Sequence, residues 1–247
     1  IISSFVFLFL SLLLVIGLYR RYQFIKKTKK IIENEKNISN SLLLNILPEE
    51  TAQELKKNGK VVAKRYELAT VLFTDFEGFT NYSEDLPPEK LVESIDYYFS
   101  KFDEIIDKYD LEKIKTIGDS YMCAGGIPFE TDDHAYQVIL AALDIIDFVE
   151  QSNNRLLDDQ INFKVRVGVN SGSIVAGIVG TKKFAYDIWG DTVNIASRME
   201  SNSETGKINI SENTYQLVKE QFSCKYRGEI QVKNKGMMKM YFVEHME

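Results

Sequence analysis

The sequence predicts an α+β domain whose elements follow the order strand, helix, strand, strand, helix, strand, behind an apolar N-terminal helix and a connecting helix. Two observations carry this prediction. The spacing of apolar residues alternates between the periods of strands and helices in that order, and residues 1–19 contain no charged side chain. With 45% apolar and 27% charged residues among 247, the composition argues against a disordered or low-complexity chain.

The overall charge gives no reason to expect a nucleic-acid partner. The chain has 30 Lys and Arg against 36 Asp and Glu, for a net charge of −6, whereas phosphate backbones bind to concentrated basic surfaces. Cys123 and Cys224 are the only cysteines, so neither a disulfide framework nor a CxxC zinc site is expected. We therefore predict two reduced thiols and no nucleic acid among the partners.

Residues 1–19 are predicted to form a transmembrane helix. They are nearly all apolar and close to the roughly 20 residues that an α-helix needs to cross a bilayer. Positive charge follows this segment instead of preceding it, which disfavours a signal peptide and predicts that the rest of the chain is cytoplasmic. The basic residues before the first acidic one, Glu33, are Arg20, Arg21, Lys26, Lys27, Lys29 and Lys30. Because residue 1 is Ile and not Met, we expect the C-terminal part of a longer protein, with one membrane pass in this part.

Residues 20–59 are predicted to connect the membrane to the soluble domain. From Phe24 to Leu47 the pattern is helical, with a weak heptad spacing that polar residues interrupt at Thr28 and Glu35. Two interpretations stay open: a solvated linker helix, or a short parallel coiled coil between two copies of the chain. A second short helix follows Pro48 and ends at Asn58-Gly59. The apolar heptad positions are Phe24, Ile31, Ile38 and Leu42.

Residues 60–247 are predicted to form the soluble domain. Residues 68–73 are of strand type, and 89–109 place apolar side chains on one helical face. Residues 111–118 and 121–125 predict two strands joined by a tight turn at Gly118-Asp119. Residues 135–149 predict a second amphipathic helix.

The end of this pattern completes the predicted fold. Apolar and other residues alternate strictly over 163–170, which predicts a half-exposed strand, and the Gly-rich 171–180 predicts a further strand. The order of elements is the split βαβ arrangement of a ferredoxin-like βαββαβ core. Such a fold hosts many activities, so the function has to be argued from the loops.

Two acids stand where neighbouring strands of this core end. Asp75 lies at the end of the first predicted strand, and residues 76–80 form a turn after it. This turn leads toward a helix whose free backbone N–H groups could hold phosphate oxygens. Asp119 lies in the adjacent hairpin turn. Paired carboxylates at strand ends suit hard divalent cations such as Mg²⁺, which binds one or two carboxylates together with substrate phosphates. The sequence therefore predicts a metal-assisted nucleotide site, although either acid alone would more often form a turn.

Five segments give a more specific prediction. FTDFEGFT, EKIKTIGDSYM, VRVGVNSGSIVAGIVG, YDIWGDTVNIASRME and VKNKGMMKMYFV occur in this order within residues 61–245. Together they closely resemble the class III nucleotidyl cyclases, the catalytic domain of adenylate and guanylate cyclases.

The resemblance implies a metal site. It assigns Asp75, Asp119 and the backbone carbonyl of Phe76 as ligands of two Mg²⁺ or Mn²⁺ ions in each active site. One ion would lower the pKa of the ribose 3′-hydroxyl and the other would hold the triphosphate. The loop Gly78, Phe79 and Thr80 would bind the phosphates.

The resemblance also implies a homodimer with two shared active sites, because the family builds each site from two subunits. Asn194 would position the ribose, and Arg198 would stabilise the charge on the α-phosphate with its permanent charge and forked donors. Lys235 corresponds to a family lysine that contacts the terminal phosphates. The sequence departs from some relatives at Ser173, where they have an arginine that contacts phosphate.

Two further positions predict the base. Adenylate cyclases of the family carry Lys and Asp where guanylate cyclases carry Glu and Cys or a similar small residue, and this chain has Lys115 and Asp187. A lysine can donate to adenine N1 and a carboxylate can accept from the N6 amino group. We therefore expect ATP as the substrate and an adenylate cyclase at the membrane. The alternatives are a guanylate cyclase and a nucleotide-binding regulatory module without turnover.

Overall fold

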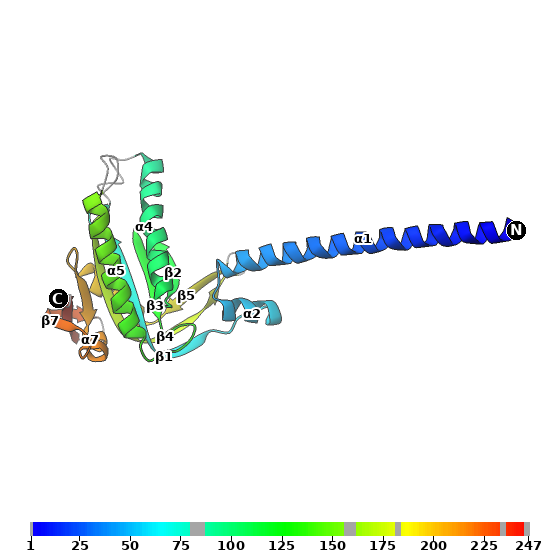
Figure 1. The fold of residues 1–247 in the computed structure, drawn as a ribbon. Coiled ribbons are helices and arrows are strands. Elements are labelled where there is room, and N and C mark those ends of the chain that lie inside the picture. Colours follow the sequence, from blue (N-terminus) through cyan, green and yellow to red (C-terminus); the bar gives the residue numbers. More distant parts are fainter. Residues whose placement is uncertain (1, 80–86, 156–161, 181–183, 233–235, 245–247) are drawn as a thin grey trace. The chain divides into compact units, whose positions relative to one another are not determined.

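The structure is a computed structural model that describes residues 2–79, 87–155, 162–180, 184–232 and 236–244 (Figure 1). The chain divides into two compact units, Ile1–Lys57 and Asn58–Glu247. Each unit is described by itself below.

The first unit consists of two helices. α1 (Ile2–Leu44) is one continuous helix of 43 residues, so the predicted membrane segment and connecting helix form a single element. Its residues Phe7–Leu44 make it, by length and composition, the one helix of the described chain able to cross a membrane. α2 (Glu49–Asn58) places acidic residues in its first turn and basic residues in its last, which complements the helix dipole. As predicted, it starts after Pro48 and stops at Gly59, whose φ is +69°.

The second unit is built on a mixed sheet with the strand order β2-β3-β1-β4-β6-β8-β7, and β5 pairs with the far part of β4. The first six elements are β1 (Lys64–Phe76), α4 (Pro88–Lys108), β2 (Glu112–Ile117), β3 (Ser120–Gly125), α5 (His134–Arg155) and β4 (Val165–Val179). They follow the predicted βαββαβ order. After them come β5 (Ala185–Trp189), α6 (Asp191–Ser201), β6 (Ile208–Ser211), α7 (Glu212–Val218), β7 (Ser223–Val232) and β8 (Gly236–Glu244).

The prediction of two separate strands over 163–180 is wrong. β4 runs without a break from Val165 to Val179 and pairs with β1 along most of its length. Two glycines of this strand make room for α6. A Cβ on Gly168 would lie 1.8 Å from the backbone nitrogen of Glu200, and one on Gly172 would lie 2.7 Å from the Thr192 hydroxyl.

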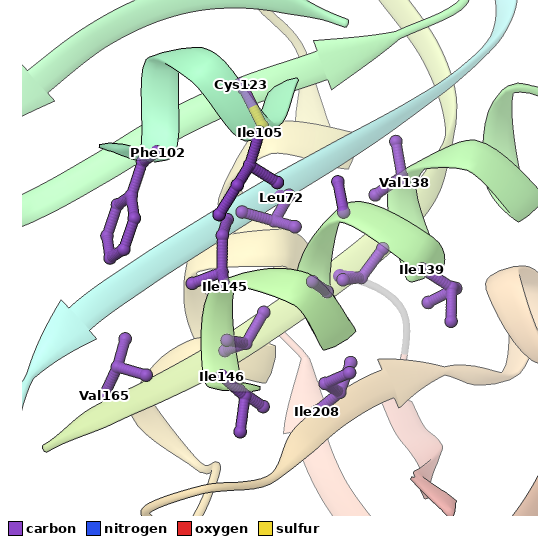
Figure 2. Close-up of a cluster of buried hydrophobic side chains, with 14 of the residues drawn as sticks. Leu72, Phe102, Ile105, Cys123, Val138, Ile139, Ile145, Ile146, Val165 and Ile208 are labelled. Carbon is purple, nitrogen blue, oxygen red and sulfur yellow. The ribbon is translucent and has the colours of Figure 1, made fainter. Parts of the chain in front are cut away.

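The two faces of the sheet are covered differently, because alternate residues of a strand point to opposite faces. Val165, Val167 and Val169 of β4 join the main apolar core under α4 and α5, which lie side by side in Figure 1. Figure 2 shows the centre of this core, where Leu72 of β1 and Cys123 of β3 lie among side chains of the two helices. Both cysteines are free thiols, as predicted.

The alternate residues of β4 lie beneath α6. Asn170 donates a hydrogen bond from Nδ2 to the backbone oxygen of Thr192 (2.9 Å), and Gly168 allows the close approach described above. A small apolar cluster joins Ile195 and Met199 of α6 to Val232 of β7 and Met240 of β8. This helix is thus fixed firmly to the face of β4 that also carries Arg166.

Candidate active site

The structure brings Asp75 and Asp119 together at neighbouring strand ends. β1 pairs with β3 up to Thr74 and Tyr121, so Asp75 lies beside the turn that carries Asp119. The Ser120 hydroxyl donates to the backbone oxygen of Thr74 over 2.9 Å and ties the two strand ends. Gly118 forms the predicted turn with φ of +61°, a conformation that favours glycine.

The two carboxyl groups influence each other electrostatically. Burial raises the pKa of the Asp119 carboxyl above its usual range, and the negative charge of Asp75 raises it further. Backbone hydrogen bonds from Asp119 itself and from Phe76 act in the opposite direction. Both carboxylates are thus held near each other against their repulsion, which a cation would relieve.

The donor set fits a divalent metal. Two carboxylates are hard oxygen ligands, and Mg²⁺ commonly binds one or two of them while substrate phosphates and water complete its coordination. Within the described ranges, no cluster of three or more His, Cys, Asp and Glu side chains is arranged as a metal centre. Asp75 and Asp119 would hold such a cation together with oxygens of the substrate and of water.

Two charged residues near Asp75 were missed by the sequence reasoning. Arg166 donates from Nη2 to Asp75 Oδ2 (2.7 Å) and from Nε to Glu200 Oε1 (2.5 Å). Burial and the charge of Asp75 raise the pKa of Glu200, while Arg166 opposes this shift. The sequence pattern placed Arg166 on the exposed side of a half-exposed strand, so only the structure shows that Arg166 and Glu200 are partly or largely buried and need charged partners.

The loop after Asp75 is anchored on both sides. The Phe76 ring is buried and stacks on Phe163 with centroids 4.5 Å apart. The Glu77 backbone N–H donates to the Lys164 oxygen over 2.8 Å, and Gly78 has φ of +73°. Phe79 packs against the main core. The predicted phosphate-binding residue Thr80 lies outside the described residues, so the loop is defined only as far as Phe79.

The two predicted base-reading residues form an ion pair. Lys115 of β2 donates from Nζ to Asp187 Oδ2 of β5 over 2.6 Å. The Lys115 side chain is 40% exposed and that of Asp187 19% exposed, so the pair is accessible from solvent. A lysine donor and a carboxylate acceptor thus lie side by side at one place on the surface.

Asn194 and Arg198 lie on α6, one turn apart, and both are exposed. Arg198 donates from Nη1 to the backbone oxygen of Gln231 over 3.4 Å. In the described part of the chain, neither residue forms a hydrogen bond or ion pair with Asp75 or Asp119. Lys235 lies outside the described residues.

Comparison with known families identifies the protein family of this chain. A family model described as the adenylate and guanylate cyclase catalytic domain matches residues 61–245. The chain belongs to this family. It therefore contains a class III nucleotidyl cyclase catalytic domain, as its sequence segments predicted. Catalytic domains of this kind generally use divalent metals, and the two acids of the cyclase fit that use.

Curated relatives of the cyclase include enzymes named for both nucleotides. An adenylate cyclase of Mycobacterium tuberculosis is 40% identical and covers 88% of this chain and 48% of its own length. The guanylate cyclase soluble subunit beta-2 of Rattus norvegicus is 37% identical and covers 88% of this chain and 32% of its own. The chain thus spans about half the length, or less, of these relatives.

Solved structures agree with the fold. The catalytic core of a rhodopsin-guanylyl cyclase with converted specificity, in complex with ATPαS, aligns with a TM-score of 0.70 at 36% identity, covering 74% of this chain and 98% of that one. The adenylyl cyclase CyaB from P. aeruginosa aligns with a TM-score of 0.69 at 30% identity, covering 75% and 97%. These alignments confirm the α+β fold of the cyclase.

Proposed function

We propose that this cyclase is an adenylate cyclase, which converts ATP to 3′,5′-cyclic AMP and pyrophosphate at sites shared by two copies of the chain. The observation that carries the choice of ATP is the ion pair between Lys115 and Asp187, 2.6 Å long and open to solvent. The Lys115 ammonium donates to adenine N1, and Asp187 accepts from the N6 amino group. Guanine presents a protonated nitrogen and a carbonyl at these places, so it offers neither side chain the hydrogen bond that adenine provides.

Asp75, Asp119 and the backbone carbonyl of Phe76 would hold two Mg²⁺ or Mn²⁺ ions. When bound, these ions supply Lewis acidity to the 3′-hydroxyl and to the triphosphate oxygens. The mutual repulsion of the two acids supports this role, since a cation stabilises both ionised carboxylates.

The remaining residues orient the substrate around one displacement at phosphorus. A bond forms between the ribose 3′-oxygen and the α-phosphorus, the bond from that phosphorus to the β-phosphate oxygen breaks, and the hydroxyl proton passes to solvent. The partner subunit's Asn194 positions the ribose, and the partner subunit's Arg198 stabilises the charge that develops on the α-phosphate. Backbone N–H groups of Gly78, Phe79 and Thr80 bind phosphate oxygens, and Lys235 contacts the terminal phosphates.

Two subunits are required by this assignment. Asn194 and Arg198 are exposed on α6 and form no hydrogen bond or ion pair with Asp75 or Asp119 in the described chain, which supports their acting on a second copy. Exposed apolar side chains at Phe24, Ile31 and Ile38 of α1 are also compatible with pairing of two such helices.

We further propose that residues 1–19 cross a membrane and that the catalytic domain is cytoplasmic. The support is the length and apolar composition of α1 together with the basic residues that follow its apolar part. In sealed inside-out vesicles, protease added outside should degrade the catalytic domain. Protection of the domain until detergent is added would contradict this orientation.

The central experiment uses the full chain in detergent micelles. It is incubated with ATP or GTP and with Mg²⁺ or Mn²⁺ at several protein concentrations, and products are separated by chromatography. We expect cyclic AMP, with activity that rises faster than protein concentration. Cyclic GMP as the main product would identify a guanylate cyclase, and tight nucleotide binding without product would identify a binding module.

A specificity variant tests the base assignment directly. Lys115→Glu combined with Asp187→Cys should shift the preference from ATP toward GTP by about tenfold or more, since each lost hydrogen bond leaves a polar group unpaired. A matched control is Lys101→Glu with Glu104→Cys, which removes an exposed ion pair on α4. Unchanged ATP selectivity in the first variant would refute the assignment.

A further inference from the structure

Asp75 has a partner that the proposed mechanism does not use. Asp75 on β1 and Arg166 on β4 are direct cross-strand neighbours in the register of the sheet. Their ion pair is 2.7 Å long, and the side chains are only 20% and 31% exposed, respectively. Charge-assisted bonds in such partly buried places are stronger than exposed ion pairs. Arg166 therefore fixes one oxygen of Asp75 in a defined direction.

Arg166 is itself held from the other side. Its Nε donates to Glu200 Oε1 over 2.5 Å, and the Glu200 side chain is 9% exposed. Glu200 cannot easily move, because α6 lies directly on β4 where Gly168 leaves no room even for a methyl group. The Arg166 guanidinium thus forms hydrogen bonds with two carboxylates at once, that of Glu200 and that of Asp75.

The main chain around Asp75 is fixed independently of this contact. Asp75 lies within the ladder of backbone hydrogen bonds that joins β1 to β4. Two residues further on, the backbone N–H of Glu77 donates to the backbone oxygen of Lys164. The Thr205 hydroxyl also donates to Glu77 Oε2 over 2.5 Å. A change at Arg166 should therefore alter the orientation and charge of the Asp75 carboxylate more than the fold around it.

We propose that Arg166 is a positioning residue that holds the Asp75 carboxylate in the direction that turnover requires and, together with Glu200, sets how strongly that carboxylate attracts a divalent cation. The positive charge of Arg166 offsets part of the charge of Asp75, and Glu200 draws part of the guanidinium charge toward itself. Removing Arg166 should thus strengthen attraction of a cation, whereas removing the charge of Glu200 should weaken it. The proposal rests on the function of Asp75 in metal binding given above.

The test compares Mn²⁺ binding by the full chain in detergent micelles, measured by electron paramagnetic resonance. The titrations contain 3′-deoxyATP, which lacks the attacking hydroxyl, and a reference titration without protein is subtracted. Arg166→Gln should lower the Mn²⁺ Kd by about threefold to tenfold, and Glu200→Gln should raise it by a similar factor. Lys101→Gln and Glu104→Gln, which break an exposed ion pair on α4, are the charge-matched controls and should change the Kd by less than about twofold.

A third variant separates orientation from charge. Arg166→Lys keeps the positive charge but loses the fork that reaches both carboxylates, so the Mn²⁺ Kd should stay within about twofold while kcat with ATP falls by about tenfold. Equal kcat in this variant and the wild type would refute the positioning role. If Arg166→Gln loses its cooperative thermal transition, the Glu200→Gln variant tests the proposal alone. A higher Mn²⁺ Kd in that variant supports the proposal, and an unchanged or lower Kd contradicts it.

The outcomes distinguish this inference from the proposed function. If Asp75→Asn weakens Mn²⁺ binding but Arg166→Gln and Glu200→Gln shift it in the same direction, only the present inference is overturned. If Asp75→Asn leaves Mn²⁺ binding unchanged, the metal site itself is misassigned and both are overturned. Opposite shifts in the two variants support both.

Discussion

On one face of the sheet, α4 and α5 bury apolar side chains of β1, β3 and β4. On the opposite face, buried apolar residues of β1 such as Val71 and Phe73 alternate with the core residues, and this face also carries the charged Asp75 of β1 and Arg166 of β4. Leu72 and Val165 belong to the first face; Asp75 and Arg166 belong to the second. The first face therefore serves packing alone, whereas the second combines packing with the charged residues of the site. This difference teaches that substitutions on the two faces should have opposite profiles, with stability lost on the first and activity lost on the second.

The largest effect is expected on the charged face. Asp119→Asn should lower cyclase activity by about 10⁴-fold, or roughly 5 kcal/mol of activation free energy, because a metal ligand is lost. The melting temperature should not fall, since the ionised carboxylate is disfavoured by burial and by Asp75. Activity assays and calorimetry on the same preparation check both parts. A large drop in melting temperature would contradict the expected difference between the two faces of the sheet.

The opposite profile is expected on the apolar face. Phe102 of α4 is fully buried and packs against Phe76 and Tyr121. Phe102→Ala should reduce the free energy of unfolding by about 3–5 kcal/mol, because it removes a large buried side chain and leaves a cavity. At a temperature where the variant is still folded, its activity per folded molecule should stay within about threefold of the wild type. Denaturant titration and assays at low temperature measure these quantities.

Gly168 should combine the two profiles, since it lies where α6 meets β4. In Gly168→Ala the new Cβ would lie 1.8 Å from the backbone nitrogen of Glu200, so α6 must shift. We expect a loss of about 1–3 kcal/mol in stability from overpacking, together with a loss of activity larger than that of Phe102→Ala. Gly228→Ala is a control at a position with open space but strained backbone. Unchanged activity in a destabilised Gly168→Ala protein would show that α6 tolerates displacement.

The smallest effect concerns an acid outside both clusters. Burial, with a smaller contribution from Asp107, raises the pKa of Glu112 to about 7. A carboxyl group with a raised pKa gives its full stability below its unfolded pKa of about 4.5 and loses it as the pH rises through about 7. Glu112→Gln should therefore leave the melting temperature unchanged near pH 4.5 and raise stability by about 1–2 kcal/mol at pH 8. Exposed Glu220→Gln is the control, and a gain that does not depend on pH would contradict the prediction.

Local patterns predicted the parts of the site that lie close in the chain. Asp75 and Asp119 were expected at adjacent strand ends, because a hairpin with a glycine turn and the order of elements leave few other arrangements. The continuity of β4 was not predicted, since glycines inside a strand and glycines between two strands give the same local signal. Only packing against α6 distinguishes the two cases.

Contacts between residues far apart in the sequence could not be predicted from local patterns. Lys115 and Asp187 are separated by 72 positions and were matched only through resemblance to cyclases. Arg166 and Asp75 are 91 positions apart, and nothing in either local segment names the other.

By itself the sequence determined the family, the order of elements and the residue types of the proposed chemistry, because periodicity and motif spacing are properties of neighbouring residues. Only the tertiary structure decided that Arg166 faces Asp75 and that Glu200 braces it. Such pairings depend on strand register and on the contact of α6 with β4, which hold distant segments together through packing and hydrogen bonds.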